Sequence, residues 1–336
     1  MNILLTGGTG YIGSHTAAVL TSAGHKVVLY DNLRNSDASV VDRLEKITGA
    51  RLPFVLGDVR YTALLASTLK SYGIEAVIHF AGLKAVRESA QNPLEYYDNN
   101  VGGSISLLNA MAEVGIKRLV FSSSATVYGN PQYLPIDEAH PKSATNPYGR
   151  TKLQVENILE DLAASGADWR ITCLRYFNPV GAHESGLIGE DSKGFPNNLM
   201  PLLVRVAAGE SPRLNVFGDD NDTPDGTGVR DYIHVMDLAA GHLAAVSVLS
   251  AEGASFEAFN LGTGRGHSVL EVLKAFERAS GVKIQSQVVP KQSCDVAHSV
   301  AKADKAAKTL SWYALRRLDD MCSSAWRFQI KKAQEM

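Results

Sequence analysis

Short apolar runs alternate with helical patterns through the first half of the chain. The runs occupy residues 3–5, 27–30, 54–56, 76–80, 119–122 and 171–175. Apolar residues at helical spacing lie between them, for example at 104–113. Strands that alternate with helices form parallel sheets with helices on both faces. The pattern therefore predicts an α/β fold with a doubly wound parallel sheet.

The pattern changes after residue 176. Residues 177–230 are rich in Gly, Pro, Asn and Asp and hold one helical stretch, at 198–208. Helical patterns follow at 269–280 and in parts of 301–310 and 318–331, while 231–249 and 259–261 resemble a return to the first domain. We expect a first domain over residues 1–176, to which 231–261 return, and a smaller α/β domain over 177–336.

Three glycines, Gly7, Gly10 and Gly13, directly follow the first apolar run. A strand that turns on glycines into a helix points backbone N–H groups and the positive end of the helix dipole at a ligand. This suits a pyrophosphate, so the turn predicts a dinucleotide site. The spacing is Gly-x-x-Gly-x-x-Gly, not the Gly-x-Gly-x-x-Gly of most such sites, and taken alone it also fits a plain tight turn.

Asp31 ends the second apolar run, and a carboxylate at this position bears on whether the dinucleotide is NAD or NADP. A carboxylate about twenty residues beyond the glycines accepts hydrogen bonds from a ribose diol and repels a 2′-phosphate. Asp31 therefore favours NAD over NADP, although Arg34 nearby is of the type that accommodates the phosphate. Small or polar residues also end the other strands, as ligands beyond the carboxyl ends of a parallel sheet require: Gly7, Asp31, Asp58, Ala81 and Ser122 to Ser124.

Tyr148 and Lys152 supply the candidate chemistry. They stand four residues apart on a helical pattern that Pro147 begins, so they share one face. A phenol with a reference pKa near ~10 is protonated at neutral pH, and a nearby ammonium lowers that pKa. Such a pair also occurs as a plain helix-surface contact. The serine-rich strand end with Ser124 and the glycine turn favour the catalytic interpretation.

Composition excludes several classes of function. The net charge of −2 gives no basis for binding nucleic acid or an anionic membrane, and no apolar run is long enough to cross a bilayer. Cys173, Cys294 and Cys322 have no metal-ligand or disulfide spacing, which is typical of free thiols in a reducing compartment. We expect a cytoplasmic protein with no leader segment, no metal site and no membrane or nucleic-acid partner.

Several motifs together carry a family resemblance. TGGTGYIG at residues 6–13 with Tyr148-x-x-x-Lys152 resembles the extended short-chain dehydrogenase/reductase superfamily. Four further stretches are similar to the UDP-glucose 4-epimerase family: HFAGLKAV at 79–86, YYDNNV at 96–101, LRYFNPVGA at 174–182 and GTGVRDYIH at 226–234. The likeness extends from residue 1 to about 312.

The resemblance implies a Rossmann-type NAD-binding domain, a smaller domain for UDP-sugars, and a homodimer that pairs helices at 101–113 and 148–162. Besides the glycines, the residues implied at the NAD site are Tyr11, Ile12, Asp31, Asn32, Asn35, Ser36, Asp58, Val59, Phe80, Ala81, Lys84, Asn99 and Phe177. Ser124, Tyr148 and Lys152 are implied to be catalytic. The residues implied to hold the UDP-sugar are Asn178, Asn198, Leu199, Asn215, Phe217, Arg230 and Asp295.

The implied reaction interconverts UDP-glucose and UDP-galactose through a 4-keto sugar with bound NAD, a step of galactose metabolism. Two alternatives remain: a nucleotide-sugar 4,6-dehydratase and a non-catalytic NAD-binding regulator. A dehydratase carries Asp-Glu directly after the catalytic hydroxyl, where this chain has Ala125 and Thr126. A regulator would not require Ser124, Tyr148 and Lys152 together.

Two positions qualify the resemblance. The family's Arg-x-Gly-Asp is here Gln292-Ser-Cys-Asp295, so one diphosphate contact is in doubt, with Lys291 adjacent. Ser299, four residues beyond Asp295, matches a position that borders the sugar pocket in this family. A tyrosine there tends to exclude sugars with an N-acetyl group, whereas a small residue leaves room for one. Ser299 therefore predicts turnover of UDP-N-acetylglucosamine and UDP-N-acetylgalactosamine as well.

Overall fold

The computed structural model describes residues 1–194, 196, 198–249, 253–291 and 296–335. Its larger sheet has seven strands, and every neighbouring pair is parallel. In spatial order the strands are β10 (Ser255–Leu261), β6 (Arg170–Tyr176), β5 (Arg118–Ser124), β4 (Ala76–His79), β1 (Asn2–Thr6), β2 (Lys26–Asp31) and β3 (Phe54–Leu56). The doubly wound parallel sheet predicted from the sequence is confirmed.

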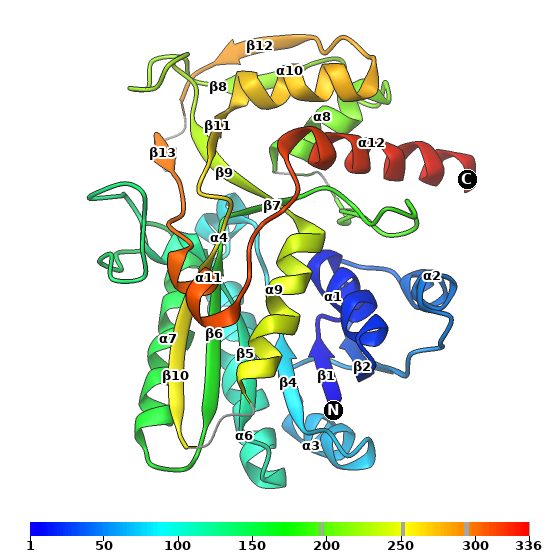
Figure 1. Cartoon of the computed structure of the whole chain (residues 1–336), viewed down its shortest axis with the longest axis vertical. Helices are drawn as coiled ribbons and strands as arrows, with labels where there is room; N and C mark the ends of the chain where they lie inside the picture. The colour runs from blue at the N-terminus through cyan, green and yellow to red at the C-terminus, as the bar shows by residue number, and fades with distance from the viewer. Residues whose placement is uncertain (195, 197, 250–252, 292–295, 336) are drawn as a thin grey trace.

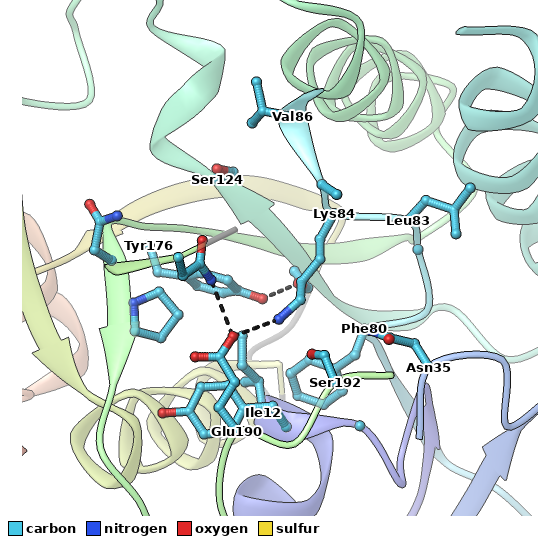
Figure 2. A pocket seen from close by; sticks show the side chains of 18 of the residues that line it. Ile12, Asn35, Phe80, Leu83, Lys84, Val86, Ser124, Tyr176, Glu190 and Ser192 are labelled. Atoms are coloured by element: carbon cyan, nitrogen blue, oxygen red, sulfur yellow. Dashed lines mark hydrogen bonds and ion pairs between the residues drawn. The ribbon is translucent and has the colours of Figure 1, made fainter. Parts of the chain in front are cut away.

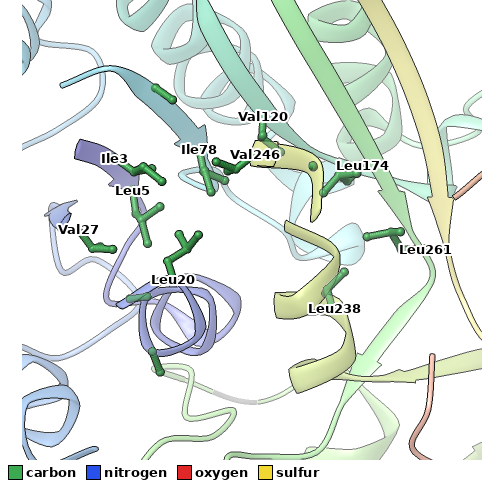
Figure 3. Close-up of a cluster of buried hydrophobic side chains, with 14 of the residues drawn as sticks. Ile3, Leu5, Leu20, Val27, Ile78, Val120, Leu174, Leu238, Val246 and Leu261 are labelled. Carbon is green, nitrogen blue, oxygen red and sulfur yellow. The ribbon is translucent and has the colours of Figure 1, made fainter. Parts of the chain in front are cut away.

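Helices cover both faces of this sheet (Figure 1). Alternate residues of a strand point to opposite faces, so a strand buried on both sides is apolar throughout. Ile3 and Leu5 of β1 pack on one face, with Leu20 of α1 (Tyr11–Ser22) and Leu238 of α9 (Val235–Val248) (Figure 3). Leu4 packs on the other face, which is covered by α3 (Thr62–Ser71), α6 (Gly103–Val114) and α7 (Pro147–Ala164).

Four short elements complete this half around the carboxyl ends of the strands. They are α4 (Val86–Gln91), α5 (Pro93–Tyr96), the π-helical turn η1 (Tyr97–Gly102) and the 3₁₀ turn η2 (Ala125–Val127). Helix α2 (Ser39–Thr48) follows β2, and α11 (Asp304–Leu310) packs beside β10 and α9. The four short elements determine the path of the chain at the carboxyl ends of the strands, where ligands lie in such a sheet.

The smaller half lies above the carboxyl ends of those strands in Figure 1 and has its own core. One of its sheets joins β9 (Val229–His234) to β7 (Asn178–Val180), β11 (Gly266–Ser268) and β13 (His298–Ser299). A second pairs β8 (Leu214–Phe217) with β12 (Ser286–Val289). Three helices pack on them: α8 (Leu199–Ala207), α10 (Val269–Ser280) and α12 (Leu318–Glu335).

The chain returns to the large sheet later than the sequence pattern suggests. The expected return begins at residue 231, but β9, which includes residues 231–234, pairs with β7, β11 and β13 in the smaller half. The return begins with α9, which packs on α1, and continues with β10 beside β6. Hydrophobic pattern alone identifies a buried strand without saying which sheet it joins.

Candidate active site

A cavity of about 940 Å³ lies between the two halves. Residues of both halves line it, from the glycine turn of β1 to β8, β9 and β13. The site residues expected from the sequence that line it are Gly7, Gly10, Tyr11, Ile12, Gly13, Asp31, Asn32, Asn35, Ser36, Val59, Phe80, Ala81, Lys84, Asn99, Ser124, Tyr148, Lys152, Phe177, Asn178, Asn198, Leu199, Asn215, Phe217, Arg230 and Ser299. Segments almost 300 residues apart thus face one space.

The glycine turn has the geometry that a dinucleotide requires. Gly7 has φ +70°, and a Cβ there would lie 2.8 Å from the Ala81 nitrogen. A Cβ on Gly13 would lie 2.2 Å from the Gly7 carbonyl oxygen. Helix α1 therefore starts close behind β1, and its N-cap, Gly10, offers no side chain to the first N–H groups. Those N–H groups face the cavity and fit the pyrophosphate of a dinucleotide.

Asp31 stands at the carboxyl end of β2, held in place by its neighbours. Its carboxylate accepts from the Leu33 nitrogen at 2.8 Å and from the Ser36 hydroxyl at 3.2 Å. The side chain is buried at the cavity wall, and its carboxylate also accepts from the Thr9 nitrogen at 3.2 Å, so one of its four lone pairs remains for a ribose diol. Arg34, the residue that could have favoured NADP, forms an ion pair with Glu95 at 2.6 Å.

Asp58 is the one described site residue that does not line the cavity. Its carboxylate accepts from the Arg60 side chain at 2.9 Å and from the Asn32 amide at 3.0 Å. The hydrogen bonds from Arg60 hold the pKa of Asp58 well below its usual range. Asp58 thus fixes Asn32, which does line the cavity. Gln292 and Asp295 lie outside the described residues.

Helix α7 delivers Tyr148 to the cavity. Pro147 occupies its first turn, and the Asn146 side chain caps it by accepting from the Gly149 nitrogen at 2.9 Å. A Cβ on Gly149 would lie 2.9 Å from the Thr126 carbonyl oxygen, so glycine allows α7 to approach η2 closely. This approach brings Tyr148 beside Ser124, the last residue of β5.

The electrostatics around Tyr148 differ from the sequence expectation in one respect. Burial raises the pKa of Tyr148, and the hydrogen bond with Ser124 lowers it. Lys152 lies 6.0 Å from the Tyr148 ring centre, and its ammonium donates to the Ser122 carbonyl at 2.7 Å. The residue that lowers the phenol pKa in this structure is therefore Ser124, because Lys152 is directed at β5. Burial also lowers the pKa of Lys152, to about 8.

The structure adds Thr126 to the site. Its hydroxyl donates to the Ser124 Oγ at 2.9 Å, and its backbone nitrogen donates to the same atom at 3.2 Å. With both bonds accepted, the Ser124 hydroxyl proton is directed away from η2, toward Tyr148. The local sequence Ser-x-Thr contained the signal, since a serine before a short turn commonly caps it.

Glu190 also escaped the sequence analysis. Its carboxylate accepts from the Lys84 ammonium at 3.0 Å, as Figure 2 shows, and from the Asn198 amide at 3.1 Å. Its side chain is only 12% exposed. One carboxylate thus joins a residue expected at the NAD site to one expected at the UDP-sugar site. No local pattern marks Glu190, because Lys84 lies 106 residues away.

The other end of the cavity is built on the smaller sheets. Asn215 and Phe217 extend from β8, and Ser299 of β13 pairs in register with Arg230 of β9. The Arg230 guanidinium donates to the Val229 carbonyl at 2.9 Å. Lys291 lines the same end. Amide, aromatic and cationic groups of this kind suit a nucleoside diphosphate.

A search of the described residues finds no group of His, Cys, Asp and Glu that could hold a metal ion. In the same part of the chain, no helix is both long and apolar enough to cross a bilayer.

Comparison with known proteins adds the family. Residues 3–262 match the model of the NAD dependent epimerase/dehydratase family. UDP-glucose 4-epimerase of Dictyostelium discoideum is 54% identical over 97% of this chain and 95% of its own length. UDP-glucose 4-epimerase of Bacillus subtilis (strain 168) is 52% identical over 98% of this chain and 97% of its own length.

Two solved structures have nearly the same fold. UDP-glucose-4-epimerase from Stenotrophomonas maltophila, crystallised with NAD and formylated UDP-arabinopyranose, has a TM-score of 0.98 and 51% identity over 100% of both chains. The Bifidobacterium longum enzyme, in complex with NAD⁺ and UDP, has a TM-score of 0.96 and 48% identity, again over 100% of both. With the glycine turn, the Asp31 wall and the Ser–Tyr–Lys group, these matches show that the chain belongs to the NAD dependent epimerase/dehydratase family and, within it, to the UDP-glucose 4-epimerases.

Proposed function

We propose that this chain interconverts UDP-glucose and UDP-galactose by inverting C4 of the hexose, with a place in galactose metabolism. The observation that carries the proposal is that one cavity joins the glycine turn, Ser124 with Tyr148, and the basic end at Arg230. Residues 1–176 with α9 and β10 form the cofactor domain in this proposal, and the remainder of 177–336 forms the UDP-sugar domain.

The residues of the chain perform the acid–base part of the reaction. The Tyr148 phenolate takes the proton from the C4 hydroxyl as general base and returns it in the reverse step. Ser124, oriented by Thr126, donates a hydrogen bond to the same oxygen and positions it. NAD, when bound at the glycine turn and Asp31, supplies the hydride acceptor and donor for C4. Lys152 of α7 donates to the Ser122 carbonyl of β5, and its proposed part is to hold the nicotinamide ribose.

Inversion needs a 4-keto sugar that rotates to present its opposite face before it is reduced again. The UDP must stay anchored while the hexose rotates about its bonds to the diphosphate. Asn178, Asn198, Leu199, Asn215, Phe217 and Arg230 are the proposed anchors among the described residues, and Asp295 is proposed from the resemblance. The sugar would rotate within the same cavity of about 940 Å³ that takes the cofactor and the UDP.

The dehydratase alternative lacks its acid and base. Removing water across C5 and C6 needs proton transfer next to the catalytic hydroxyl, but η2 places Ala125 and Thr126 there. Neither side chain titrates near neutral pH, and the Thr126 hydroxyl is occupied with Ser124. The epimerase reaction requires no such pair.

One assay separates all three candidates. Purified protein is mixed with UDP-galactose, without added NAD, and the products are separated by chromatography. We expect UDP-glucose and no change in net redox state. A 4-keto-6-deoxy product would indicate the dehydratase, and unchanged substrate with bound NAD would indicate the regulator.

We propose that N-acetylated UDP-sugars are substrates too. Ser299 lines the cavity beside Arg230, and a serine there lacks the volume of a tyrosine ring. Steric exclusion is the strongest way for a pocket to reject a larger sugar. A small side chain at position 299 therefore admits the acetamide in both orientations of the sugar. The test is the substrate pair UDP-N-acetylglucosamine and UDP-N-acetylgalactosamine.

A homodimer and a cytoplasmic location complete the proposal. The dimer would pair α6 and α7 with their copies, and Ile105 of α6, 42% exposed, supports an apolar contact there. Light scattering measures the mass in solution. Cys173 and Cys322 are free and buried, which favours a reducing compartment. Cell fractionation tests that location.

A further inference from the structure

Glu190 holds two cavity residues from different halves of the molecule on one oxygen atom. Its Oε1 accepts from the Lys84 ammonium at 3.0 Å, as Figure 2 shows, and from the Asn198 amide at 3.1 Å. Lys84 lies between β4 and α4, in the half with the glycine turn, whereas Asn198 directly precedes α8 in the smaller half. All three residues line the cavity. The position of each donor therefore depends on the other through Glu190.

Lys84 lies where the cofactor is expected. Its ammonium is 6.0 Å from the ring centre of Tyr11, the first residue of α1, and the N-terminal N–H groups of α1 fit the pyrophosphate. An ammonium has three donors, and one of them is given to Glu190. Lys84 can therefore bind a cofactor oxygen without leaving Glu190.

Asn198 is placed in the same way toward the UDP-sugar. It is the N-cap of α8, but its side chain makes no cap hydrogen bond. One amide N–H is donated to Glu190, so a second N–H and the amide oxygen remain for a ligand in the described part of the chain. Glu190 thus orients Asn198 and leaves its binding groups available.

We propose that Glu190 is a positioning residue that couples binding of the dinucleotide to binding of the UDP-sugar. The inference rests on the proposed function and deepens it. A cofactor that binds Lys84 orders Glu190 and, through it, Asn198, so the UDP-sugar loses less side-chain freedom when it binds. The Lys84 charge also neutralises a carboxylate that would otherwise repel both diphosphates. Coupling is reciprocal, so bound UDP must tighten NAD by the factor by which NAD tightens UDP.

The test measures the Kd of NAD by equilibrium dialysis of the holoenzyme, with and without saturating UDP. We expect UDP to lower this Kd about tenfold in the wild type, within the usual range for coupled sites. Glu190→Ala removes both contacts, so the ratio of the two Kd values should fall to about one. Glu190→Gln keeps an oxygen for Asn198 but loses the charge that holds Lys84, so its ratio should lie between. The ratio is the readout because general damage to the cavity would weaken NAD equally with and without UDP.

Asp191→Asn is the matched control. Asp191 is the next residue and lines the same cavity, but its carboxylate pairs with Lys332 of α12 at 2.6 Å, within the smaller half. Its ratio should equal that of the wild type. A ratio that falls as far as in Glu190→Ala would overturn the inference, because the placement of the whole segment would then matter and not the contact of Glu190.

An unchanged ratio in Glu190→Ala also overturns the inference, since UDP would then retain NAD merely by filling the cavity. A wild type whose affinity for NAD does not respond to UDP overturns it as well. Turnover of UDP-galactose is measured separately. A wild type that binds NAD and UDP without turnover refutes the proposed function and leaves the coupling ratio valid.

Discussion

Tyr148 is the residue on which the proposed chemistry depends most directly. Burial raises the pKa of this phenol, and the hydrogen bond with Ser124 lowers it, so its ionisation depends on Ser124. Tyr148→Phe keeps the ring and removes the base. We expect kcat to fall by ~10²–10⁴, the usual range for loss of a general base. Bound NAD, measured after denaturation, should be unchanged because the glycine turn is intact.

Tyr133→Phe is the control for that substitution, because Tyr133 is an exposed phenol, 43% accessible, outside the cavity lining. It should retain full activity. Near-normal turnover in Tyr148→Phe would contradict the assigned base.

Thr126 tests whether orientation of Ser124 matters apart from its presence. Thr126→Val preserves the shape and removes the hydroxyl that donates to Ser124 at 2.9 Å. The Ser124 proton can then turn back toward η2, so we expect kcat to fall about tenfold, the effect of roughly one neutral hydrogen bond. KM for UDP-galactose should not change, since Thr126 contacts none of the residues that are proposed to anchor the UDP. Ser124→Ala should be slower still, and equal rates for Thr126→Val and wild type would remove Thr126 from the site.

Ser299 governs substrate range in our proposal. Ser299→Tyr places a phenol ring on β13 beside Arg230, in the space that an acetamide would use. We expect kcat/KM for UDP-N-acetylglucosamine to drop by at least two orders of magnitude, while UDP-galactose is affected far less. The proposal is wrong if the wild type does not turn over N-acetylated UDP-sugars, or if Ser299→Tyr turns them over as fast as the wild type does.

At the scale of elements, a buried ion pair ties α7 to β6. The Arg175 guanidinium donates to Glu156 of α7 at 2.9 and 2.7 Å, and the Ser123 hydroxyl of β5 donates to the same carboxylate at 2.6 Å. Both charged side chains are almost fully buried. The contact fixes the helix that presents Tyr148 against the strand that ends in Ser124.

Removing Arg175 leaves the buried Glu156 carboxylate with only the more distant Lys142 ammonium, at 3.8 Å, as a counter-ion. Arg175→Met should therefore lower the free energy of unfolding by about 3–5 kcal/mol, measured by urea denaturation. The double variant Arg175→Met/Glu156→Leu should recover much of that loss, because no unpaired charge remains. Arg278→Met breaks the exposed pair with Asp319 and should cost less than about 1 kcal/mol. Equal losses from the buried and the exposed pair would show that Glu156 is not isolated.

At the scale of the whole molecule, buried histidines make the fold sensitive to acid. Burial lowers the pKa of His242 from 6.5 to about 4, and the ring packs between Phe80 and Tyr176. Burial likewise lowers the pKa of His15 and of His79, each to about 3. The unfolded chain takes up these protons below pH 6.5 while the folded chain does not. Stability is therefore lost as the pH falls from about 6.5 toward each folded-state value.

His242→Leu removes one of these groups. At pH 5 the His242 contribution to that loss is about 2 kcal/mol, from its two pKa values. We expect urea unfolding to show a smaller drop in stability between pH 7.5 and pH 5 for the variant, by about that amount. The comparison at pH 7.5 measures the packing change separately. The same drop in both proteins would mean that His242 does not titrate as its burial requires.

Local patterns in the sequence determined the large sheet, the glycine turn and the helix face that carries Tyr148 and Lys152. Each depends on neighbours along the chain: an apolar run buried on both faces, a backbone that only glycine allows, or a spacing of four residues. The family resemblance supplied most of the cavity lining. The short strands of the smaller half carry no such pattern, because β11 and β13 are only three and two residues long.

The tertiary structure decided what distant segments do together. Glu190 meets Lys84, Arg87 meets Phe217, and β9 joins the smaller sheets instead of the large one. None of these pairings has a local signature, since a side chain 100 residues away is chosen by topology and packing, not by spacing along the chain. The sequence by itself thus identifies the chemistry and its family, whereas the fold determines which side chains position that chemistry and how the two halves share one substrate.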